Sequence, residues 1–257
     1  MRTKGSCVGR GWPELRYCVF GDIHGNLEAL EAVVADAKRL GAERYVCVGD
    51  IVGYGANPAE CADRVQGLTT QIVAGNHDCA AVGRTELEYF NRYARDAVVW
   101  TRSQLSPSDK AFLRELRLTL EMEELTVAHA TLDRPEEFGY IECDASARRS
   151  FDAMSGGVAF VGHSHVPVAF FYEIGKKQVL YTKDPEIELD SSSKAIVNVG
   201  SVGQPRDGDP RASYALYDSA RRTVTLRRLS YNVEAAVQKI LAAGLPAVLG
   251  QRLLYGH

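Results

Sequence analysis

The chain has 257 residues, of which 46% are hydrophobic and 25% are charged, and its formal net charge is -3. This composition is ordinary for a globular protein and provides enough apolar material for a large core. The small negative charge gives no broad basic surface, so we expect no specific nucleic-acid binding. The six cysteines are scattered without a C-x-x-C pair, which favours a reducing compartment over a disulfide scaffold.

The start of the chain does not have the pattern of an export signal. Residues 1–12 are polar and rich in glycine and arginine, and they lack the apolar core of a signal peptide. No uninterrupted apolar stretch of the sequence is long enough to span a bilayer. We therefore expect a cytoplasmic protein without membrane contact, in which residues 1–14 are peripheral or disordered.

The first eighty residues alternate between β-rich runs and helical patterns. The helix expected over residues 27–40 has apolar side chains at helical spacing, with Asn26 as its N-cap and Gly41 as its end. Such alternation predicts right-handed crossovers and a mainly parallel sheet in this part of the chain. The elements predicted here are strands over 15–20, 44–48 and 70–74, and helices over 27–40 and 58–65.

The pattern changes near residue 168, beyond which short strands follow one another, separated by Gly, Asp and Ser. This arrangement favours hairpins and antiparallel pairing. Residues 183–194 are acidic and rich in serine, and we expect them to form an exposed loop. The remaining predicted elements are helices over 86–105, 107–116, 145–154 and 233–243, and strands over 125–128, 158–161, 170–173, 178–182, 195–199, 213–217 and 223–229.

These elements, without an internal repeat or a low-complexity linker, predict a single α/β domain over residues 1–257. The simplest architecture is a four-layer αββα sandwich of two mixed sheets flanked by helices. We expect substrate specificity to lie in its loops and insertions, such as residues 182–194 and the helical insertion over 86–105.

Five of the six histidines lie in short polar clusters, each of which follows a predicted strand. Histidine and carboxylate side chains are the usual ligands of catalytic transition metals. Because the clusters share this strand-then-ligand pattern, we expect them to meet at one edge of a sheet. The candidate metal ligands are Asp22, His24, Asp50, Asn76, His129, His163 and His165.

Two of the clusters place ligands at positions i and i+2. In an extended segment such residues face the same way, so Asp22 and His24 would present two ligands to one point, as would His163 and His165. Seven ligands are too many for one transition ion with an open position, but they suit two ions that share Asp50. Two carboxylates against two divalent cations leave a charge of about +2, which favours an anionic substrate.

The motifs Asp-x-His, Gly-Asp, Gly-Asn-His-Asp, a lone His and Gly-His-Ser-His, in this order, resemble the signature of the calcineurin-like metallophosphoesterase superfamily. The match runs over residues 15–217, and residues 198–214 look like a tract of its small bacterial and archaeal phosphodiesterase branch. This resemblance implies an αββα sandwich fold and a site with two metal ions.

The resemblance also implies a role for each motif residue. One ion would be held by Asp22, His24 and His165, and the other by Asn76, His129 and His163, with Asp50 between them. The catalytic residue would be His77, which would stabilise or protonate the departing oxygen while a metal-bound hydroxide attacks phosphorus in line.

Two positions depart from the protein serine/threonine phosphatase branch, whose second cluster resembles G-D-x-V-D-R-G. In this chain Gly53 replaces the carboxylate that would orient the catalytic histidine, and Tyr54 replaces an arginine that would grip phosphate. These departures weaken the protein-phosphatase hypothesis and leave His77 without an identifiable orienting partner. Arg206, in the turn over 204–207, is a candidate substrate-binding residue that would supply the missing phosphate contact.

The sequence thus predicts a metal-dependent phosphodiesterase or phosphatase that acts on a phosphorylated small molecule or a nucleotide. Two divalent or transition ions are expected as cofactors, and an imidazole-rich mixed site accepts Mn, Fe, Zn, Co or Ni. Two alternatives keep the same centre, a protein serine/threonine phosphatase and a dinucleoside-polyphosphate hydrolase. A non-catalytic metal-binding scaffold is the alternative of a different class. Edge strands in the second half could pair between the subunits of an oligomer.

Overall fold

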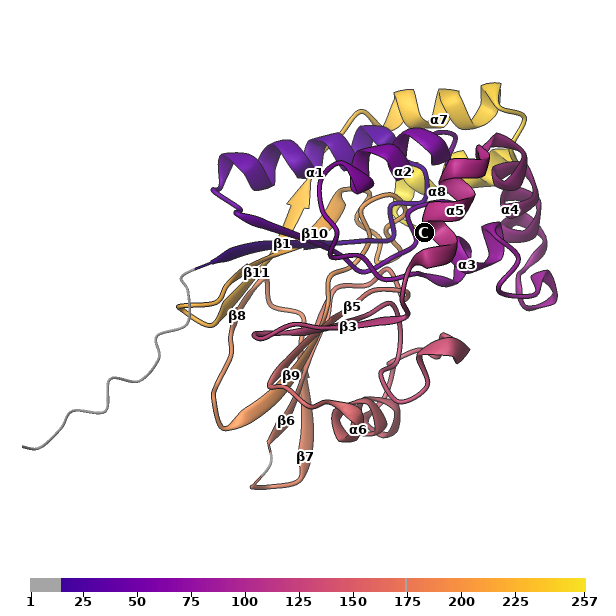
Figure 1. Cartoon of the computed structure of the whole chain (residues 1–257). Coiled ribbons are helices and arrows are strands. Elements are labelled where there is room, and N and C mark those ends of the chain that lie inside the picture. Colours follow the sequence, from indigo (N-terminus) through magenta and orange to yellow (C-terminus); the bar gives the residue numbers. More distant parts are fainter. Residues whose placement is uncertain (1–14, 174) are drawn as a thin grey trace, which may run out of the picture.

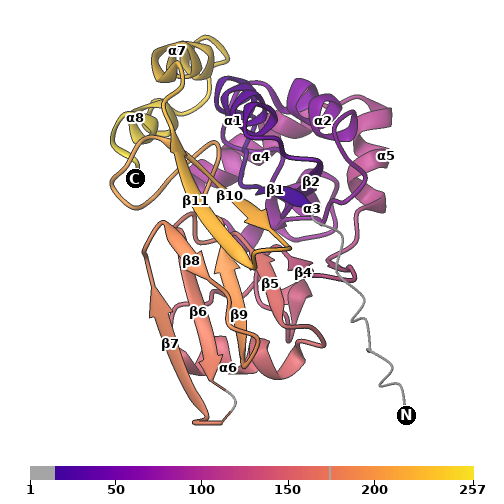
Figure 2. The same cartoon turned by 90° about the vertical axis from the view of Figure 1, so that its left-hand side faces the viewer.

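The computed structural model describes residues 15–173 and 175–257, so the expectation for residues 1–14 lies outside the described residues. Two mixed β-sheets lie face to face, and helices cover their outer faces (Figures 1 and 2). The predicted four-layer αββα sandwich is confirmed. In the described part of the chain, every helix is too short or too polar to cross a bilayer.

The first sheet joins the start of the chain to its last strands. Strands β1 and β2 pair in parallel, as the crossover helix between them requires, whereas β10 pairs with the other side of β1 in the antiparallel direction. The hairpin of β10 and β11 completes the sheet together with the short strand β8. In spatial order the five strands are β2 (Arg44–Cys47), β1 (Arg16–Phe20), β10 (Ala212–Asp218), β11 (Thr223–Leu229) and β8 (Glu186–Glu188).

The second sheet is built from the middle of the chain. Its centre is parallel, because β5 pairs in parallel with both β4 and β9, while the pairs β3–β4, β6–β9 and β6–β7 are antiparallel. In spatial order the six strands are β3 (Thr119–Glu121), β4 (Thr126–Ala128), β5 (Val158–Val161), β9 (Ser193–Asn198), β6 (Val168–Glu173) and β7 (Gln178–Thr182).

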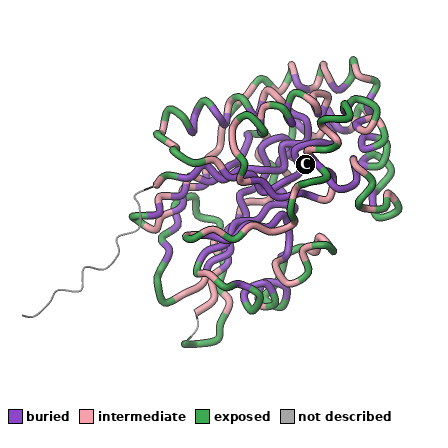
Figure 3. The backbone as a smooth tube through the Cα atoms, viewed as in Figure 1, coloured by how far each residue is buried: buried purple, intermediate pink, exposed green. Residues whose placement is uncertain are grey.

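Alternation along the central strands explains the layers, because successive side chains point to opposite faces. In β1, Phe20 packs under the helices α1 (Leu27–Arg39) and α2 (Pro58–Gln66), whereas Val19 packs between the two sheets. In β5, Phe160 packs between the sheets and Ala159 packs toward α6 (Asp144–Ala153). These strands are therefore buried on both faces, as the tube in Figure 3 shows for the centre of the molecule. Each buried Phe stabilises the fold by roughly 2 kcal/mol.

Five further helices gather at one end of the sandwich (Figure 1). One of them, formed by residues 107–115, contributes Leu113 to the apolar cluster under α1 and α2. The other four share a cluster that includes Ala80, Ala97, Ile240 and Leu249 and reaches Tyr54 in the loop after β2. This second cluster holds these four helices against the loops that follow the strands. The five helices are α3 (Asn76–Ala81), α4 (Arg92–Gln104), α5 (Pro107–Glu115), α7 (Val233–Ala242) and α8 (Ala247–Tyr255).

Several sequence-based expectations about elements are corrected by the structure. Residues 70–74 form only isolated bridges, at Ile72 with Cys47 and at Val73 with Arg117, because the chain turns into α3 directly afterwards. The helix expected over 86–105 begins later, since the side chain of Asn91 caps α4 after the short 3-10 turn Leu87–Tyr89. The expected loop 183–194 contains β8. Strand β9 was expected in antiparallel pairs only, but it pairs in parallel with β5 and antiparallel with β6. Helices α3 and α8 and strand β3 were not predicted from the sequence.

Candidate metal centre

All seven candidate ligands lie at one end of the sandwich, where strand ends from both sheets meet. Asp22 and His24 follow β1, Asp50 follows β2, and His129 follows β4. His163 and His165 follow β5, and Asn76 begins α3. Six of the seven are at most 8% exposed, and only Asn76 is half-buried. The structure therefore brings together every residue that the sequence singled out as a ligand.

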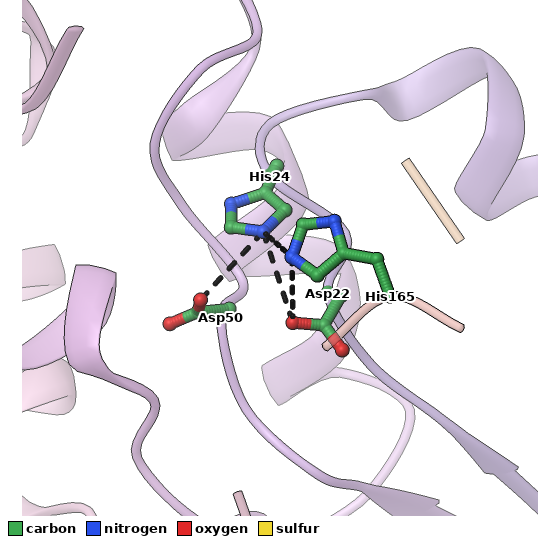
Figure 4. A group of neighbouring side chains, drawn as sticks. All are labelled: Asp22, His24, Asp50 and His165. Atoms are coloured by element: carbon green, nitrogen blue, oxygen red, sulfur yellow. Dashed lines mark hydrogen bonds and ion pairs between the residues drawn. The ribbon is translucent and has the colours of Figure 1, made fainter. Parts of the chain in front are cut away.

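The first group of converging ligand atoms consists of Asp22, His24, Asp50 and His165, which lie within 4.8 Å of one another (Figure 4). The Nε2 atoms of His24 and His165 are 3.1 Å apart. Nε2 of His165 is 3.3 Å from Oδ1 of Asp22, and Nε2 of His24 is 3.6 Å from Oδ2 of Asp50. Four potential ligand atoms from four separate side chains thus face one point.

The second group consists of Asp50, His129 and His163, also within 4.8 Å of one another. Nε2 of His129 lies 3.3 Å from Oδ2 of Asp50 and 3.2 Å from Oδ1 of Asn76. The amide oxygen of Asn76 therefore adjoins this group. Asp50 is common to both groups, and the same oxygen, Oδ2, faces His24 on one side and His129 on the other.

Hydrogen bonds of the outer ring nitrogens fix which nitrogen of each imidazole faces the centre. Nδ1 of His24, His129 and His165 lies 3.3, 2.8 and 2.6 Å from the backbone carbonyls of Val52, Val48 and Gln204. A carbonyl only accepts, so each Nδ1 carries a hydrogen, and in the neutral form of each ring the lone pair of Nε2 points inward. This is the usual support of a histidine that ligates a metal.

Each carboxylate is held by a backbone N–H from another cluster. The N–H of His163 donates to Oδ2 of Asp22 at 2.9 Å, and the N–H of His77 donates to Oδ1 of Asp50 at 2.8 Å. Glycine makes these approaches available, because a Cβ at Gly162 or Gly75 would collide with the same carboxylates. One oxygen of each carboxylate is therefore fixed, and the other is turned toward the centre.

The centre has the electrostatic properties that a cation requires. Among the described residues, Oδ1 of Asp22 has no hydrogen-bond donor although it is fully buried, which is costly for a carboxylate unless a cation compensates it. Burial alone would lower the pKa of His129, but the charge and hydrogen bond of Asp50 outweigh it and raise that pKa to about 9. The negative potential that attracts a proton there also attracts a metal ion, so this donor set fits metal binding.

The backbone of the ligands differs from the expected extended geometry. Asp22, His24, Asp50, His163 and His165 all have φ between 48 and 70°, which is the left-handed region. The extended i, i+2 geometry is therefore wrong, because the chain leaves each strand through a tight turn. Non-glycine residues in this region are strained and cluster at functional sites. The ligands converge because these turns fold back over the strand ends.

His77 lies beside the two groups, and its surroundings are aromatic. Its ring centroid is 4.5 Å from that of Tyr54, 4.8 Å from that of His24 and 4.9 Å from that of Phe90. Burial lowers the pKa of His77 to about 4, so the ring is neutral near pH 7. Among the described residues its Nδ1 has no hydrogen-bond partner. A Cβ on Gly53 would lie 2.5 Å from this Nδ1, so Gly53 leaves the space that the ring occupies.

Asp78, which the sequence left without a role, holds the turn that carries Asp50. Its Oδ1 accepts from the N–H groups of Ile51 and Val52, and its Oδ2 accepts from the N–H of Gly75. Neighbouring side chains diverge in an extended segment, but Asn76 to Asp78 are the first turn of α3. Asp78 therefore points back under the loop rather than away from it.

Arg206 lies at the rim of the centre and is not tied to its acidic neighbours. Its Nη2 donates to Oε1 of Gln204 at 2.9 Å and to the hydroxyl of Tyr54 at 3.3 Å. Asp207 and Asp209 pair instead with Arg228 and Arg211. The guanidinium is thus positioned by neutral groups, and neither Asp207 nor Asp209 pairs with it, so its positive charge can interact with a bound anion.

The centre opens into a cavity of about 300 Å³. Asp50, Asn76, His77, His163 and His165 reach its surface, together with Arg206. The insertion over 86–105, expected to influence specificity, contributes Tyr89, Phe90, Asn91 and Ala94. The sequence carried no signal for the other lining residues, because they come from loops and a helix that contain no ligand motif: Tyr140, Arg252 and His257.

Fold and side-chain arrangement together define the class: an αββα protein with candidate metal ligands gathered at its strand ends. The sequence profile of the calcineurin-like phosphoesterase superfamily domain matches residues 15–222. The chain belongs to the calcineurin-like phosphoesterase superfamily, as its motif order predicted. This superfamily consists of phosphoesterases, which are hydrolases.

Individual relatives cover nearly the whole chain. The uncharacterized protein MJ0912 of Methanocaldococcus jannaschii is 38% identical over 244 residues, which are 93% of this chain and 97% of that protein. The crystal structure of a metallophosphoesterase from Sphaerobacter thermophilus has a TM-score of 0.84 and 38% identity, and the match covers 95% of this chain and all of that one. The phosphodiesterase YfcE of Escherichia coli is 23% identical over 77% of this chain and 84% of its own.

Proposed function

We propose that this protein hydrolyses phosphate esters through a dinuclear metal centre in which Asp50 is shared. The observation that carries the proposal is the position of Oδ2 of Asp50, which faces His24 in one ligand group and His129 in the other. Two ions that share one carboxylate suit the transfer of a phosphoryl group, because they can bind both the attacking and the departing oxygen.

The proposed ligands divide into two sets. The donors are imidazole nitrogens and carboxylate or amide oxygens, a mixture that accepts Mn, Fe, Zn, Co or Ni. When bound, two such cations would neutralise the negative charge of the ester and activate a water molecule for attack. One ion would be held by Asp22, His24 and His165, the other by Asn76, His129 and His163, with Asp50 between them.

We propose His77 as the catalytic residue that acts on the departing oxygen. Its neutral ring lies at the surface of the cavity beside Asp50 and keeps one N–H to donate. Tyr54 and Phe90 pack against the ring and exclude water from its other faces. A hydrogen bond from this N–H to the leaving oxygen becomes stronger as negative charge develops there, which stabilises the transition state.

Arg206 is proposed to bind the phosphoryl oxygens. Its guanidinium faces the same cavity as His77. The acidic residues of its own turn form ion pairs with other arginines and do not neutralise it. Gln204 and Tyr54 fix one end of the group, so the remaining N–H donors are free to form a charge-assisted pair with phosphate.

The ester class is proposed from the site and from the relatives. Gly53, with its backbone against His77, leaves no room for the carboxylate of the protein serine/threonine phosphatase pattern. YfcE is a phosphodiesterase by name, which supports a diester of a small molecule or nucleotide. Protein phosphatase, dinucleoside-polyphosphate hydrolase and non-catalytic scaffold are the competing outcomes of the test below. A cytoplasmic location, an oligomer formed through edge strands and one domain over residues 1–257 are further parts of the proposal.

The test combines metal analysis with a substrate panel. Purified protein is stripped with a chelator, reloaded with each candidate metal, and analysed by mass spectrometry of the metals. Hydrolysis is then measured for p-nitrophenyl phosphate, bis(p-nitrophenyl) phosphate, a phosphopeptide and diadenosine tetraphosphate. We expect two metal equivalents per chain and the highest kcat/KM on the diester. Binding of fewer than two equivalents of every metal, or metal loading without hydrolysis of any ester, would contradict the proposal.

A further inference from the structure

A second hollow lies beside the catalytic cavity. It has a volume of about 600 Å³, and two of its lining residues, Tyr140 and Arg206, also line the cavity that contains His77. The ring of Tyr140 stacks on that of the candidate ligand His163, with centroids 4.2 Å apart and an interplanar angle of 21°. The two spaces therefore adjoin at Tyr140 and Arg206, and Tyr140 packs directly on a candidate metal ligand.

The surface of the hollow is aromatic and apolar. Tyr140 and Tyr181 are its walls, with 47% and 68% of their surfaces exposed, and Val168, Phe170 and Ile141 form an apolar floor. Large exposed rings beside an apolar floor are typical of a surface that binds another molecule. Most of the floor belongs to β6, whose pairing with β9 and β7 keeps it rigid.

The charges at the rim favour an anionic molecule. Lys183 and Arg206 reach the hollow, whereas Glu142 is the acidic residue at its edge. Two positive groups against one negative group leave a net positive rim. A hollow with an apolar floor, two tyrosine rings and a positive rim suits a planar group attached to a phosphate.

We propose that this hollow is a subsite for the second substituent of a phosphodiester, and that this substituent is a planar aryl or nucleobase-containing group. The proposal rests on the proposed function, because the phosphoryl group must lie at the metal centre for the substituent to reach the hollow. Arg206 then binds the phosphate at the junction of the two spaces. A monoester of a small alcohol would leave the hollow without a contact, whereas a diester fills it.

Binding of inert phosphonates tests the subsite without catalysis. Phenylphosphonate and methylphosphonate differ only in the planar group, and their affinities for the metal-loaded protein are measured by isothermal titration calorimetry. We expect phenylphosphonate to bind about tenfold more tightly, since stacking and burial of one ring provide that factor. Tyr181→Ala should reduce the ratio of the two affinities to about threefold or less.

Leu180→Ala is the matched control for the strand. Leu180 precedes Tyr181 on β7, is 42% exposed, and points to the opposite face of the sheet, away from the hollow. This variant should keep the native ratio of affinities. An unchanged ratio in Tyr181→Ala, or an equal loss in both variants, would overturn the subsite.

Kinetics with one leaving group extends the test to substrates. Methyl p-nitrophenyl phosphate, bis(p-nitrophenyl) phosphate and the p-nitrophenyl ester of thymidine 5′-monophosphate all release p-nitrophenolate and differ in the second substituent. We expect KM to be about tenfold lower for the aryl and nucleoside esters than for the methyl ester. Tyr181→Ala should abolish most of this ratio. Equal KM values for all three esters in the native protein would refute the proposal.

The outcomes separate this proposal from the one on which it rests. Bound metal and hydrolysis without a preference for the planar group would leave the proposed function intact and remove the subsite. Absence of metal binding would remove both. The size of the particle in solution is measured for native protein and Tyr181→Ala by analytical ultracentrifugation. Conversion of a dimer into a monomer, with the phosphonate ratio unaltered, would assign the hollow to a contact between two copies and overturn the proposal.

Discussion

The backbone N–H of His77 donates a 2.8 Å hydrogen bond to Oδ1 of Asp50, which leaves Oδ2 facing both His24 and His129. The proposed catalytic residue and the proposed shared ligand are thus joined directly through the main chain. This bond is independent of the side chain at position 77, so metal binding and leaving-group chemistry can be separated by mutation.

Asp50→Asn should reduce metal binding in a protein that remains folded. An amide has no charge to share between two cations, and its NH₂ group would face the histidine nitrogens instead of a lone pair. We expect bound metal to fall from two equivalents to one or fewer, and kcat to fall by at least about 100-fold. Asp63→Asn, at an exposed position of α2, is the matched control and should change neither quantity. Full metal content in the Asp50 variant would exclude the shared ligand.

His77→Ala should reduce kcat without removing metal. The ring is lost, but the N–H that fixes Asp50 remains. We expect kcat to fall by about 10²–10⁴-fold for an ester with an alkyl leaving group. The loss should be smaller for p-nitrophenolate, which departs without a proton. Equal losses for both leaving groups, measured at constant metal content, would show that His77 does not act on the departing oxygen.

Gly53→Ala should displace the ring of His77 by direct steric contact. The backbone at Gly53 has φ of +96°, and an added Cβ would lie 2.5 Å from Nδ1 of His77. Gly83→Ala is the matched control, because Gly83 has φ of +78° but no atom within 4 Å of its added Cβ. Both variants should lose about 1–2 kcal/mol of unfolding free energy to backbone strain. Only Gly53→Ala should also have a lower kcat. Similar kcat values for the two variants would contradict the idea that Gly53 leaves the space for the His77 ring.

Asp36→Asn should destabilise the fold and change its dependence on pH. Asp36 of α1 accepts from the hydroxyl of Tyr214 at 2.8 Å and from Arg227 at 3.1 Å, and it also pairs with Arg39. Burial alone would raise the pKa of Asp36, but these hydrogen bonds and charges outweigh it and lower the pKa. We expect a loss of about 2 kcal/mol in unfolding free energy near pH 7.

The sign of the pH dependence follows from the lowered pKa of Asp36. The stabilisation is complete above the unfolded pKa of about 4 and is lost as the pH falls through the lower folded value. Denaturant titrations should therefore show a constant difference between native protein and variant from about pH 5 to 8, and a smaller one below about pH 4. Asp96→Asn, which affects only an exposed pair with Arg92, should change stability by less than about 0.5 kcal/mol. An equal effect of both variants would contradict a buried network.

The layers and the positions of the ligands could be predicted because they depend on local sequence patterns. Apolar runs define the strands, and the predicted N-cap Asn26 accepts the expected backbone hydrogen bond. Ser106 and Asn232 cap α5 and α7 in the same way. Each ligand motif follows a strand or begins a helix. Because these strand ends lie at the same end of the molecule, the position of each motif after its strand predicted that the ligands would meet there. The burial of the ligand side chains and the distances between them depend on the whole fold and cannot be predicted from local sequence patterns.

Three features could not be predicted because they depend on distant parts of the chain. The turns after β1, β2 and β5 are left-handed rather than extended, since Asp22 and Asp50 accept N–H groups from residues far away in sequence. Strand β8 forms in an acidic segment because β11 supplies its partner. Tyr140 and Arg252 carry no motif, and only the folded chain places them at the cavity.

The support of Asp22 has a thermodynamic consequence for the whole sandwich. Asp22 follows a strand of the first sheet, and the N–H that fixes it comes from His163, which follows a strand of the second. A cation bound at this seam is therefore linked to the docking of the two layers, so tighter binding must raise the melting temperature. Chelation should then loosen the sandwich first at the end that carries the candidate ligands, which would appear as faster amide hydrogen exchange in the turns after β1 and β5 than in α1.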